Sequence, residues 1–289
     1  MGGNSVCLFE VGPRDGLQNQ SAQIATDRKI ELVDLLSESG LTRIEATAFV
    51  SPKWVPQLAD AADVLAGINR KDGIRYAALT PNLKGYERAR DAGADEVAVF
   101  AAASEGFSQK NINCSITESL VRFEPVMEAA LKDGVPVRGY VSCVVACPYD
   151  GSIAPSEVAR VAKSLLDMGC YEISLGDTIG AGSRDTVSAM LEAVTAVVPA
   201  QKLAGHYHDT GDNALGNIET SLDFGLRVFD TAVGGLGGCP YAPGAKGNVD
   251  TVAVVARLSE LGYDTGIDMG KLEKAEQLAL AIKQEGETS

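Results

Sequence analysis

The chain has 289 residues, 45% of them hydrophobic and 22% charged, so it can bury a large core and is not intrinsically disordered. Its 25 Lys and Arg residues are outnumbered by 39 Asp and Glu residues. The resulting net charge of −14 argues against wide contact with nucleic acid or with an anionic membrane. No apolar stretch approaches the roughly 18 to 20 residues of a transmembrane helix.

Eight short runs rich in β-branched and apolar residues predict strands. In chain order they occupy residues 6–11, 43–49, 75–79, 96–101, 137–143, 172–176, 203–208 and 228–233. Segments of helical periodicity lie between them, at 26–39, 83–92, 116–132, 155–168, 184–197 and 214–224, and two more follow at 249–261 and 271–284. Several helices are followed by a glycine that suits a left-handed helix end: Gly40, Gly93, Gly134, Gly169 and Gly225.

Strands that alternate with helices at a spacing of roughly 35 residues predict an α/β fold, a single parallel (β/α)8 TIM barrel. No linker or low-complexity tract interrupts the pattern, so residues 1–289 are expected to form one domain, with 263–289 as a helical appendage outside the barrel. The main alternative is an open, doubly wound sheet. Its dinucleotide-binding form is disfavoured because no G-x-G-x-x-G follows the first strand.

The cysteine pattern bears on the cellular compartment. Six cysteines are scattered without a CxxC pair, which is typical of reduced intracellular thiols. The first residues, MGGNSVCLFEV, lack the basic and apolar regions of a signal peptide. Together these features predict a cytoplasmic protein.

The two histidines are the strongest chemical signal. His206 and His208 are the only histidines in the chain and lie two apart in a predicted strand. Side chains at this spacing share a face roughly 6.5 to 7 Å apart, so both imidazoles can reach one ion. The alternative is a chance pair of half-buried histidines.

Asp15 and Asn248 are candidate further ligands. Asp15 follows the first strand, and Asn248 follows the glycine-rich segment after the eighth; strands one, seven and eight are neighbours in a closed barrel. Each has a simpler interpretation, Asp15 as a turn residue and Asn248 as a helix N-cap. A mixed nitrogen and oxygen set without thiolate favours Mg²⁺ or Mn²⁺ over a structural zinc ion.

Four other residues at the expected catalytic face are candidates for the reaction itself. Arg14 can supply a fixed positive charge for an oxyanion, and Cys239 lies in a glycine-rich loop of the kind that closes over a site. Glu45 and Asp177 are carboxylates in or at the end of strands, suited to supporting the metal site, to pairing with an arginine or to accepting a proton. A peripheral salt bridge for Arg14 and a buried thiol for Cys239 are the alternatives.

Several blocks of this sequence, in order, resemble the 3-hydroxy-3-methylglutaryl-CoA (HMG-CoA) lyase family. They are EVGPRDGLQNQ, IEATAFVSPKWVPQLAD, LTPNLKG, KNINCSI, VRGYVSC, GCYEISLGDTIG, HYHDT and GGLGGCPYAPGAKGN. The resemblance spans residues 6 to 266. It implies a barrel enzyme that uses Mg²⁺ or Mn²⁺ to cleave HMG-CoA into acetyl-CoA and acetoacetate.

Residue roles follow from the same resemblance. It implies that the metal ligands are Asp15, His206, His208 and Asn248, and that the active-site residues are Arg14, Glu45, Asp177 and Cys239. We expect His206 or Asp177 to take the proton of the C3 hydroxyl, Arg14 to stabilise the enolate, and Cys239 to protonate it. Gln18 and Asn111 are expected to orient the acyl group, together with Arg14, and Lys53, Lys84 and Lys110 are candidates to meet the CoA phosphates.

The resemblance further implies a homodimer and a place in leucine degradation. Three other functions stay open. They are a lyase for a longer 3-hydroxy-3-substituted glutaryl-CoA, a Claisen-type synthase or aldolase acting on a 2-oxo acid, and an acyl-CoA binder without chemistry. The glycine-flanked Cys239 and the absence of a large C-terminal regulatory domain count against the synthase.

Overall fold

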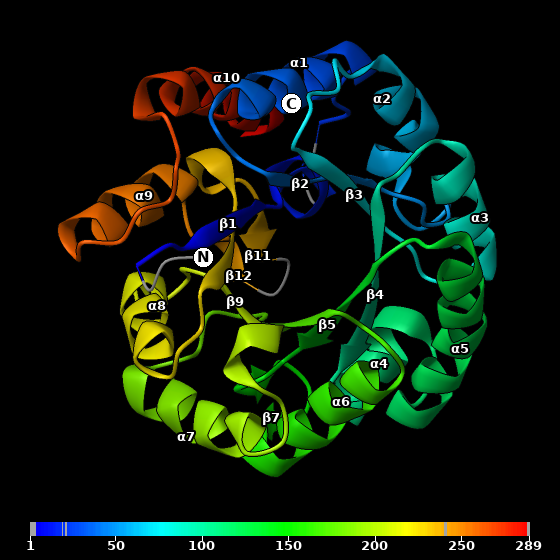
Figure 1. The fold of residues 1–289 in the computed structure, drawn as a ribbon, viewed down its shortest axis with the longest axis vertical. Coiled ribbons are helices and arrows are strands. Elements are labelled where there is room, and N and C mark those ends of the chain that lie inside the picture. The colour runs from blue at the N-terminus through cyan, green and yellow to red at the C-terminus, as the bar shows by residue number, and fades with distance from the viewer. Residues whose placement is uncertain (1–3, 19, 21, 240–241, 288–289) are drawn as a thin grey trace.

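Eight parallel strands close into a barrel in the computed structural model, which describes residues 4–18, 20, 22–239 and 242–287, with side chains omitted for 238, 239, 242–246, 286 and 287. The strands are β1 (Cys7–Glu10), β2 (Arg43–Ala48), β3 (Arg75–Leu79), β4 (Glu96–Ala102), β5 (Val137–Ser142), β8 (Glu172–Asp177), β9 (Leu203–Tyr207) and β10 (Val228–Thr231). They pair in the order β1-β10-β9-β8-β5-β4-β3-β2, and β2 returns to β1 (Figure 1). The predicted barrel and all eight predicted strands are confirmed.

Helices surround the barrel (Figure 1). They are α1 (Thr26–Glu38), α2 (Ala61–Gly67), α3 (Leu83–Asp91), α4 (Glu105–Ile112), α5 (Ile116–Asp133), α6 (Pro155–Asp167), α7 (Arg184–Thr195), α8 (Ala214–Asp223), α9 (Thr251–Glu260) and α10 (Met269–Glu287). The sequence predicted all except α2 and α4. Those two have seven and eight residues, too few for a helical period to stand out.

Glycines follow five of the helices, as expected. All five predicted helix-ending glycines adopt a positive φ, from 73° at Gly134 to 107° at Gly169. A side chain is strained in this conformation, so each glycine lets the chain leave its helix and enter the next strand.

The last helix joins the outer ring. In Figure 1, α10 lies beside α1 and close to α9, and it buries Leu272, Ala275 and Ala279 completely. The appendage therefore covers the same outer surface of the barrel as the other helices. No helix among the described residues is long and apolar enough to cross a membrane.

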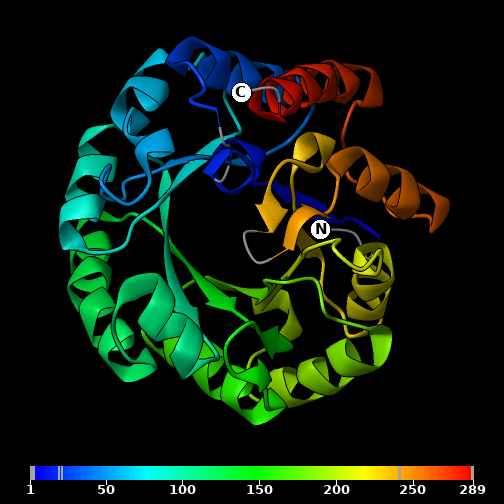
Figure 2. The ribbon, with the colours of Figure 1, turned by 180° about the vertical axis from the view of Figure 1, so that it is seen from behind.

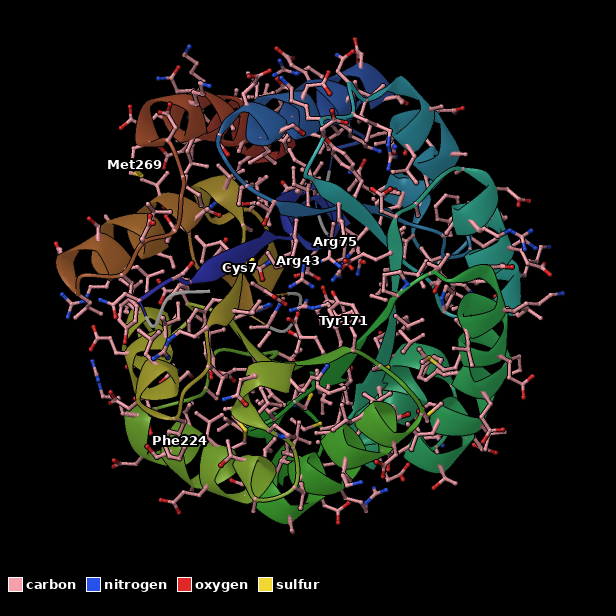
Figure 3. All side chains as sticks on the ribbon, viewed as in Figure 1. Cys7, Arg43, Arg75, Tyr171, Phe224 and Met269 are labelled. Carbon is pink, nitrogen blue, oxygen red and sulfur yellow. The ribbon has the colours of Figure 1, made fainter. Side chains whose placement is uncertain are left out.

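The barrel interior is charged where the strands begin. Arg43 and Arg75 lie near Tyr171 in the middle of the ring in Figure 3; Arg43 donates a hydrogen bond to the Tyr171 hydroxyl, and both guanidinium groups lie against its ring. Arg43 also pairs with Glu172 at 3.0 Å. Both arginines also pair with Glu96, Arg43 at 3.5 Å and Arg75 at 3.4 Å, so the buried Arg43 and Glu96 have the opposite partners that such groups require.

Two short β-hairpins lie in the loops that follow β5 and β10. Strands β6 (Ala146–Cys147) and β7 (Gly151–Ser152) pair after β5, and β11 (Gly238–Cys239) pairs with β12 (Ala242–Lys246) after β10. Figure 2 shows the β11–β12 hairpin near the middle of the ring, on the side away from the Figure 1 viewer. The hairpin follows the C-terminal end of β10, and active sites of this architecture form at that end of the strands.

Candidate metal centre and active site

A tight turn after the first strand presents two charged side chains. The π-helical segment η1 (Gly12–Gly16) begins with Pro13 in its first turn, and the N–H groups of Arg14 and Asp15 donate to the carbonyl of Val11. This turn follows β1 directly, so Arg14 and Asp15 stand at the C-terminal mouth of the barrel.

The two histidines meet Asp15 there. Nε2 of His206 lies 3.3 Å from Nε2 of His208, and Asp15 Oδ2 is 3.9 Å from each of these nitrogens. Ligands that hold one ion at roughly 2.1 Å lie about 3 to 3.5 Å apart, so a small rearrangement would place all three around one cation. Among the described residues, this trio is the group of His, Cys, Asp and Glu side chains that could hold a metal ion.

The protonation states suit a cation. Burial and the neighbouring His206 lower the pKa of His208 to about 4, so this ring is neutral at neutral pH. Burial disfavours the charge on Asp15, yet the positive charge of Arg14 holds its pKa well below the usual range. One carboxylate and two imidazoles form a donor set that fits a divalent ion.

Asn248 touches this trio through its amide. As placed, Nδ2 donates to Asp15 Oδ2 at 2.8 Å and to the carbonyl of Leu236 at 3.3 Å. The Asn248 amide can lie this close to the backbone because residue 237 is glycine: a Cβ there would lie 2.9 Å from Asn248 Nδ2. Rotating the amide by 180° would present Oδ1, the atom that binds a hard cation, instead of the amide nitrogen.

Arg14 is fixed by two carboxylates. Its Nη1 lies 2.5 Å from Asp15 Oδ1, and its Nε donates to Glu45 Oε2 at 2.6 Å. The hydroxyl of Tyr140 donates to the same Glu45 oxygen at 3.1 Å. The second oxygen, Glu45 Oε1, is buried without a hydrogen-bond partner among the described residues. Burial raises the pKa of Glu45, although Arg14 opposes that shift.

Asp177 is not brought to this cluster. Its carboxylate accepts the N–H groups of Ala181 (3.1 Å) and Gly182 (2.8 Å), so it closes the loop between β8 and α7. The preceding residue, Gly176, is the one that faces the barrel interior, since a Cβ there would lie 3.8 Å from the His206 ring. Burial raises the pKa of Asp177.

The sequence analysis missed Asp230. This aspartate on β10 has Oδ2 3.0 Å from His206 Nδ1, and both of its oxygens accept from Arg138. The rule that drew attention to Glu45, a carboxylate at an inward position of a barrel strand, applies equally to Asp230. Its partner Arg138 lies on β5, several strands away around the barrel.

One cavity of about 730 Å³ contains the candidate centre. Its lining includes Arg14, Asp15, Gln18, Asn111, His206 and His208. Of the three lysines proposed for the CoA phosphates, Lys110 lines it, while Lys53 and Lys84 are not among its lining residues. Cys239 is the last residue of β11, and its side chain lies outside what the structure describes.

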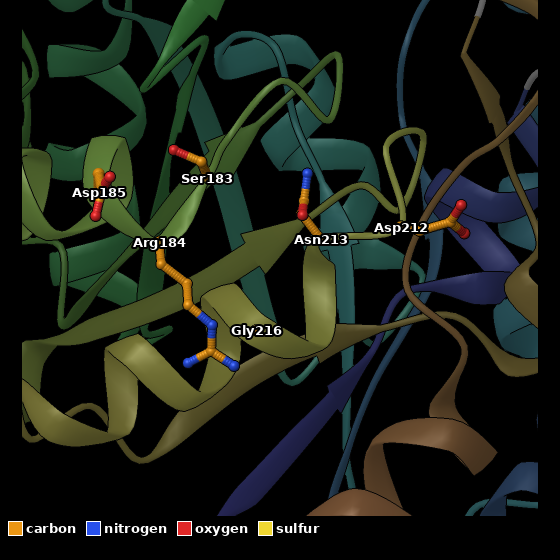
Figure 4. A pocket seen from close by; sticks show the side chains of 6 residues that line it. All are labelled: Ser183, Arg184, Asp185, Asp212, Asn213 and Gly216. Atoms are coloured by element: carbon orange, nitrogen blue, oxygen red, sulfur yellow. The ribbon is translucent and has the colours of Figure 1, made fainter.

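A second hollow, of about 530 Å³, lies at the first turns of α7 and α8. Figure 4 shows its lining residues, Ser183, Arg184, Asp185, Asp212, Asn213 and Gly216. None of them is a predicted site residue, and Arg184 is paired with Glu219. The 730 Å³ cavity is therefore the candidate active site.

Comparison with known proteins identifies relatives along almost the whole chain. The model of the HMGL-like family matches residues 5–279. A hydroxymethylglutaryl-CoA lyase named as mitochondrial, from Arabidopsis thaliana, is 60% identical over 267 residues, which are 92% of this chain and 57% of that protein. A 3-hydroxy-3-isohexenylglutaryl-CoA/hydroxymethylglutaryl-CoA lyase from Pseudomonas aeruginosa is 57% identical over 96% of this chain and 92% of its own length.

The fold is shared with a solved structure. The crystal structure of the HMG-CoA lyase from Brucella melitensis superimposes with a TM-score of 0.96 at 60% sequence identity, covering 97% of this chain and 99% of that one.

Proposed function

This chain belongs to the HMGL-like family, and from that premise we propose that it is a divalent-metal-dependent lyase that cleaves HMG-CoA to acetyl-CoA and acetoacetate. The observation that carries the proposal is the convergence of Asp15, His206 and His208 inside the large cavity. The reaction breaks the C2–C3 bond: the C3 hydroxyl loses its proton and becomes a ketone, and the bonding electrons move to C2 as a thioester enolate.

We propose that Asp15, His206 and His208 hold the ion, with the oxygen of Asn248 as a fourth ligand after its amide turns. A bound divalent ion would polarise the C3 hydroxyl and a substrate carbonyl or carboxylate oxygen, which lowers the pKa of the hydroxyl. The ion is Mg²⁺ or Mn²⁺ in this proposal, and the two imidazoles favour Mn²⁺.

The proton acceptor must be a group with a free lone pair. His206 has Nδ1 engaged with Asp230, and its Nε2 points to the ion site, so one nitrogen would have to serve two roles. Each oxygen of Asp177 accepts one backbone N–H group, which stabilises the ionised carboxylate and makes it a weaker base. Beside His206 and Asp177 we therefore propose Glu45 as the acceptor, since its Oε1 has no partner among the described residues and it is paired with Arg14, which lines the cavity.

Arg14 is proposed to stabilise the enolate oxygen. It lines the cavity, and its pairing with Glu45 and Asp15 fixes the guanidinium before substrate binds. A donor held in place in this way pays no reorganisation cost when negative charge develops on the thioester oxygen.

Cys239 is proposed to deliver a proton to C2 of the enolate, which releases acetyl-CoA. The proposal rests on its place in the hairpin after β10, next to the segment that carries Asn248. Gln18 and Asn111 are proposed to orient the acyl group, and Lys110 to meet a CoA phosphate, since all three line the cavity.

A longer substrate is a second candidate. The cavity has an apolar wall formed by Val50, Val55, Leu79 and Phe100. The Pseudomonas relative is named for an isohexenyl substrate as well as for HMG-CoA. We propose that this chain also accepts longer C3 substituents, since each buried methylene contributes about 0.8 kcal/mol.

Steady-state kinetics with HMG-CoA and with the isohexenyl ester test whether the chain accepts longer C3 substituents. We expect measurable cleavage of both CoA esters, and Val50→Phe, which narrows the apolar wall, should lower kcat/KM for the isohexenyl ester more than for HMG-CoA. Equal losses for the two esters would contradict the role of the wall.

The setting of the enzyme is proposed from the sequence and the resemblance. The five described cysteines are free, which supports a reducing compartment, and we propose the cytoplasm. A homodimer and a role in leucine degradation are proposed from the family resemblance. Size-exclusion chromatography with light scattering tests the dimer.

One experiment separates the lyase from a synthase of the same architecture. Purified protein is supplied with HMG-CoA, or with acetyl-CoA and a series of 2-oxo acids, each with and without Mn²⁺. We expect acetoacetate and acetyl-CoA from HMG-CoA alone. Condensation products from a 2-oxo acid without HMG-CoA cleavage would overturn the proposal.

A further inference from the structure

A buried carboxylate lies behind one of the two imidazoles of the candidate metal centre. Asp230 is 1% exposed, and its Oδ2 is 3.0 Å from Nδ1 of His206. The other imidazole lacks such support: Nδ1 of His208 is buried and has no hydrogen-bond partner among the described residues. The two histidines that share one ion site are therefore held in different ways.

The carboxylate itself cannot turn away. Arg138 Nη2 donates to Asp230 Oδ1 at 2.6 Å, and Nη1 donates to Oδ2 at 2.9 Å. Ser174 Oγ donates to the same Oδ2 at 2.7 Å. Arg138 is in turn fixed, since its Nε donates to Glu172 at 2.7 Å and its guanidinium lies 4.2 Å from the centre of the Phe9 ring.

This arrangement determines which nitrogen of His206 carries hydrogen. An ionised carboxylate only accepts hydrogen bonds, so His206 must present an N–H at Nδ1. In a neutral imidazole this leaves the lone pair on Nε2, the nitrogen that faces Asp15 and His208. The hydrogen bond at the back of the ring thus selects the form that can bind a cation at the front.

We propose that Asp230 is a positioning residue of the metal centre, which locks the tautomer and orientation of His206, and that Arg138 and Ser174 hold Asp230 in place. The effect on the ion rests on the proposed metal-dependent function, whereas the effect on the tautomer does not. Partners behind a metal-bound histidine typically contribute 10- to 100-fold to metal affinity, roughly the size of effect we expect here.

The first test is Mn²⁺ binding to metal-free protein, followed by electron paramagnetic resonance. Asp230→Asn should weaken binding roughly 10- to 100-fold, and Ser174→Ala, which removes one donor to Asp230, should weaken it by a smaller factor. Asp60→Asn is the matched control, since it makes the same substitution at a carboxylate that pairs with Lys29 and does not contact His206, Asp230 or Arg138. The Mn²⁺ affinity of this control should stay within about two-fold of the wild type. A loss of affinity equal to that of Asp230→Asn would reduce Asp230 to a structural role and overturn the proposal.

The second test reads the tautomer directly. The chain has two histidines, so ¹⁵N-histidine NMR of the metal-free protein gives two rings, which His208→Gln assigns. We expect His206 protonated at Nδ1 in the wild type and a mixture of tautomers in Asp230→Asn. A wild-type His206 protonated at Nε2, or an Asp230→Asn protein that binds Mn²⁺ as tightly as the wild type, would overturn the proposal.

These experiments distinguish a failure of the Asp230 proposal from a failure of the proposed metal-dependent function. If Asp230→Asn does not fold, Ser174→Ala and the wild-type NMR spectrum decide the question. If the wild type binds no Mn²⁺, the metal-dependent function fails and the ion part of this proposal fails with it. The NMR spectrum then still decides whether Asp230 fixes His206.

Discussion

Arg14 and Glu45 form a buried ion pair in which the guanidinium Nε donates to Oε2 over 2.6 Å, and this pair links η1 to the wall of the barrel. Glu45 comes from β2 and holds Arg14 at the edge of the cavity. The arginine can therefore meet developing negative charge without first rearranging.

Replacing Arg14 with Met should lower kcat by roughly 10² or more, on the scale of a lost oxyanion donor, with a smaller change in KM. Steady-state kinetics with HMG-CoA measure both. Arg14→Lys, which keeps the charge but loses the fork geometry, should fall in between. Near-normal turnover in Arg14→Met would contradict the enolate role.

Asp177 should stabilise the loop between β8 and α7, and it should not be the group that accepts the substrate proton. Asp177→Ala leaves the N–H groups of Ala181 and Gly182 without their acceptor, at a cost of about 1 to 3 kcal/mol for the buried N–H of Gly182. Urea unfolding measures this loss. In Asp177→Asn, kcat should still fall at low pH as it does in the wild type, so the acid limb of the pH profile is kept. Glu45→Gln should lose turnover while still binding Mn²⁺. A missing acid limb in Asp177→Asn would instead identify Asp177 as the base.

Glu10 gives a prediction on stability and pH. Its carboxylate accepts from the N–H groups of Gly12 and Val233 and from the hydroxyl of Thr251, and burial raises its pKa from 4.5 to about 7. Because the folded-state pKa is the higher one, the protonated group stabilises the fold fully below pH 4.5. That contribution, on the order of 3 kcal/mol, is lost as the pH rises to about 7.

Glu10→Gln should therefore flatten the decline in unfolding free energy between pH 4.5 and 7. Urea unfolding at a series of pH values measures it, with Glu192→Gln, at an exposed position on α7, as the control. An unchanged slope in Glu10→Gln would show that Glu10 is not the group that titrates.

Cys239→Ala should abolish most turnover while leaving Mn²⁺ affinity within about two-fold. The thiol is proposed to act after the carbon–carbon bond breaks, so the variant should still form acetoacetate in a single slow turnover. Rapid-quench analysis of acetoacetate against acetyl-CoA measures the separation of the two steps. Full turnover with metal bound would exclude the proton-donor role.

The barrel could be predicted from the sequence because its strands and helices carry their own signals. Each strand is a short apolar run, and five of the helices are followed by a glycine with positive φ, such as Gly134. The short helices α2 and α4 span at most about two turns, too few to show a period.

Within the site, the histidine pair was visible because its spacing is local in sequence. Asp230 was not, because its contacts with His206 and Arg138 join three different strands. Asp177 was placed correctly at a strand end, but strand alternation turns it away from the interior that Gly176 faces. Whether the last side chain of a strand points into the barrel therefore has to be worked out from the alternation of the residues before it.

The most direct test of the whole account is HMG-CoA cleavage by metal-stripped protein, before and after Mn²⁺ is added back, alongside His208→Gln. The account predicts negligible cleavage without metal, equal amounts of acetyl-CoA and acetoacetate after one Mn²⁺ binds per chain, and little recovery in His208→Gln. Cleavage that proceeds at the same rate without any divalent ion would contradict it.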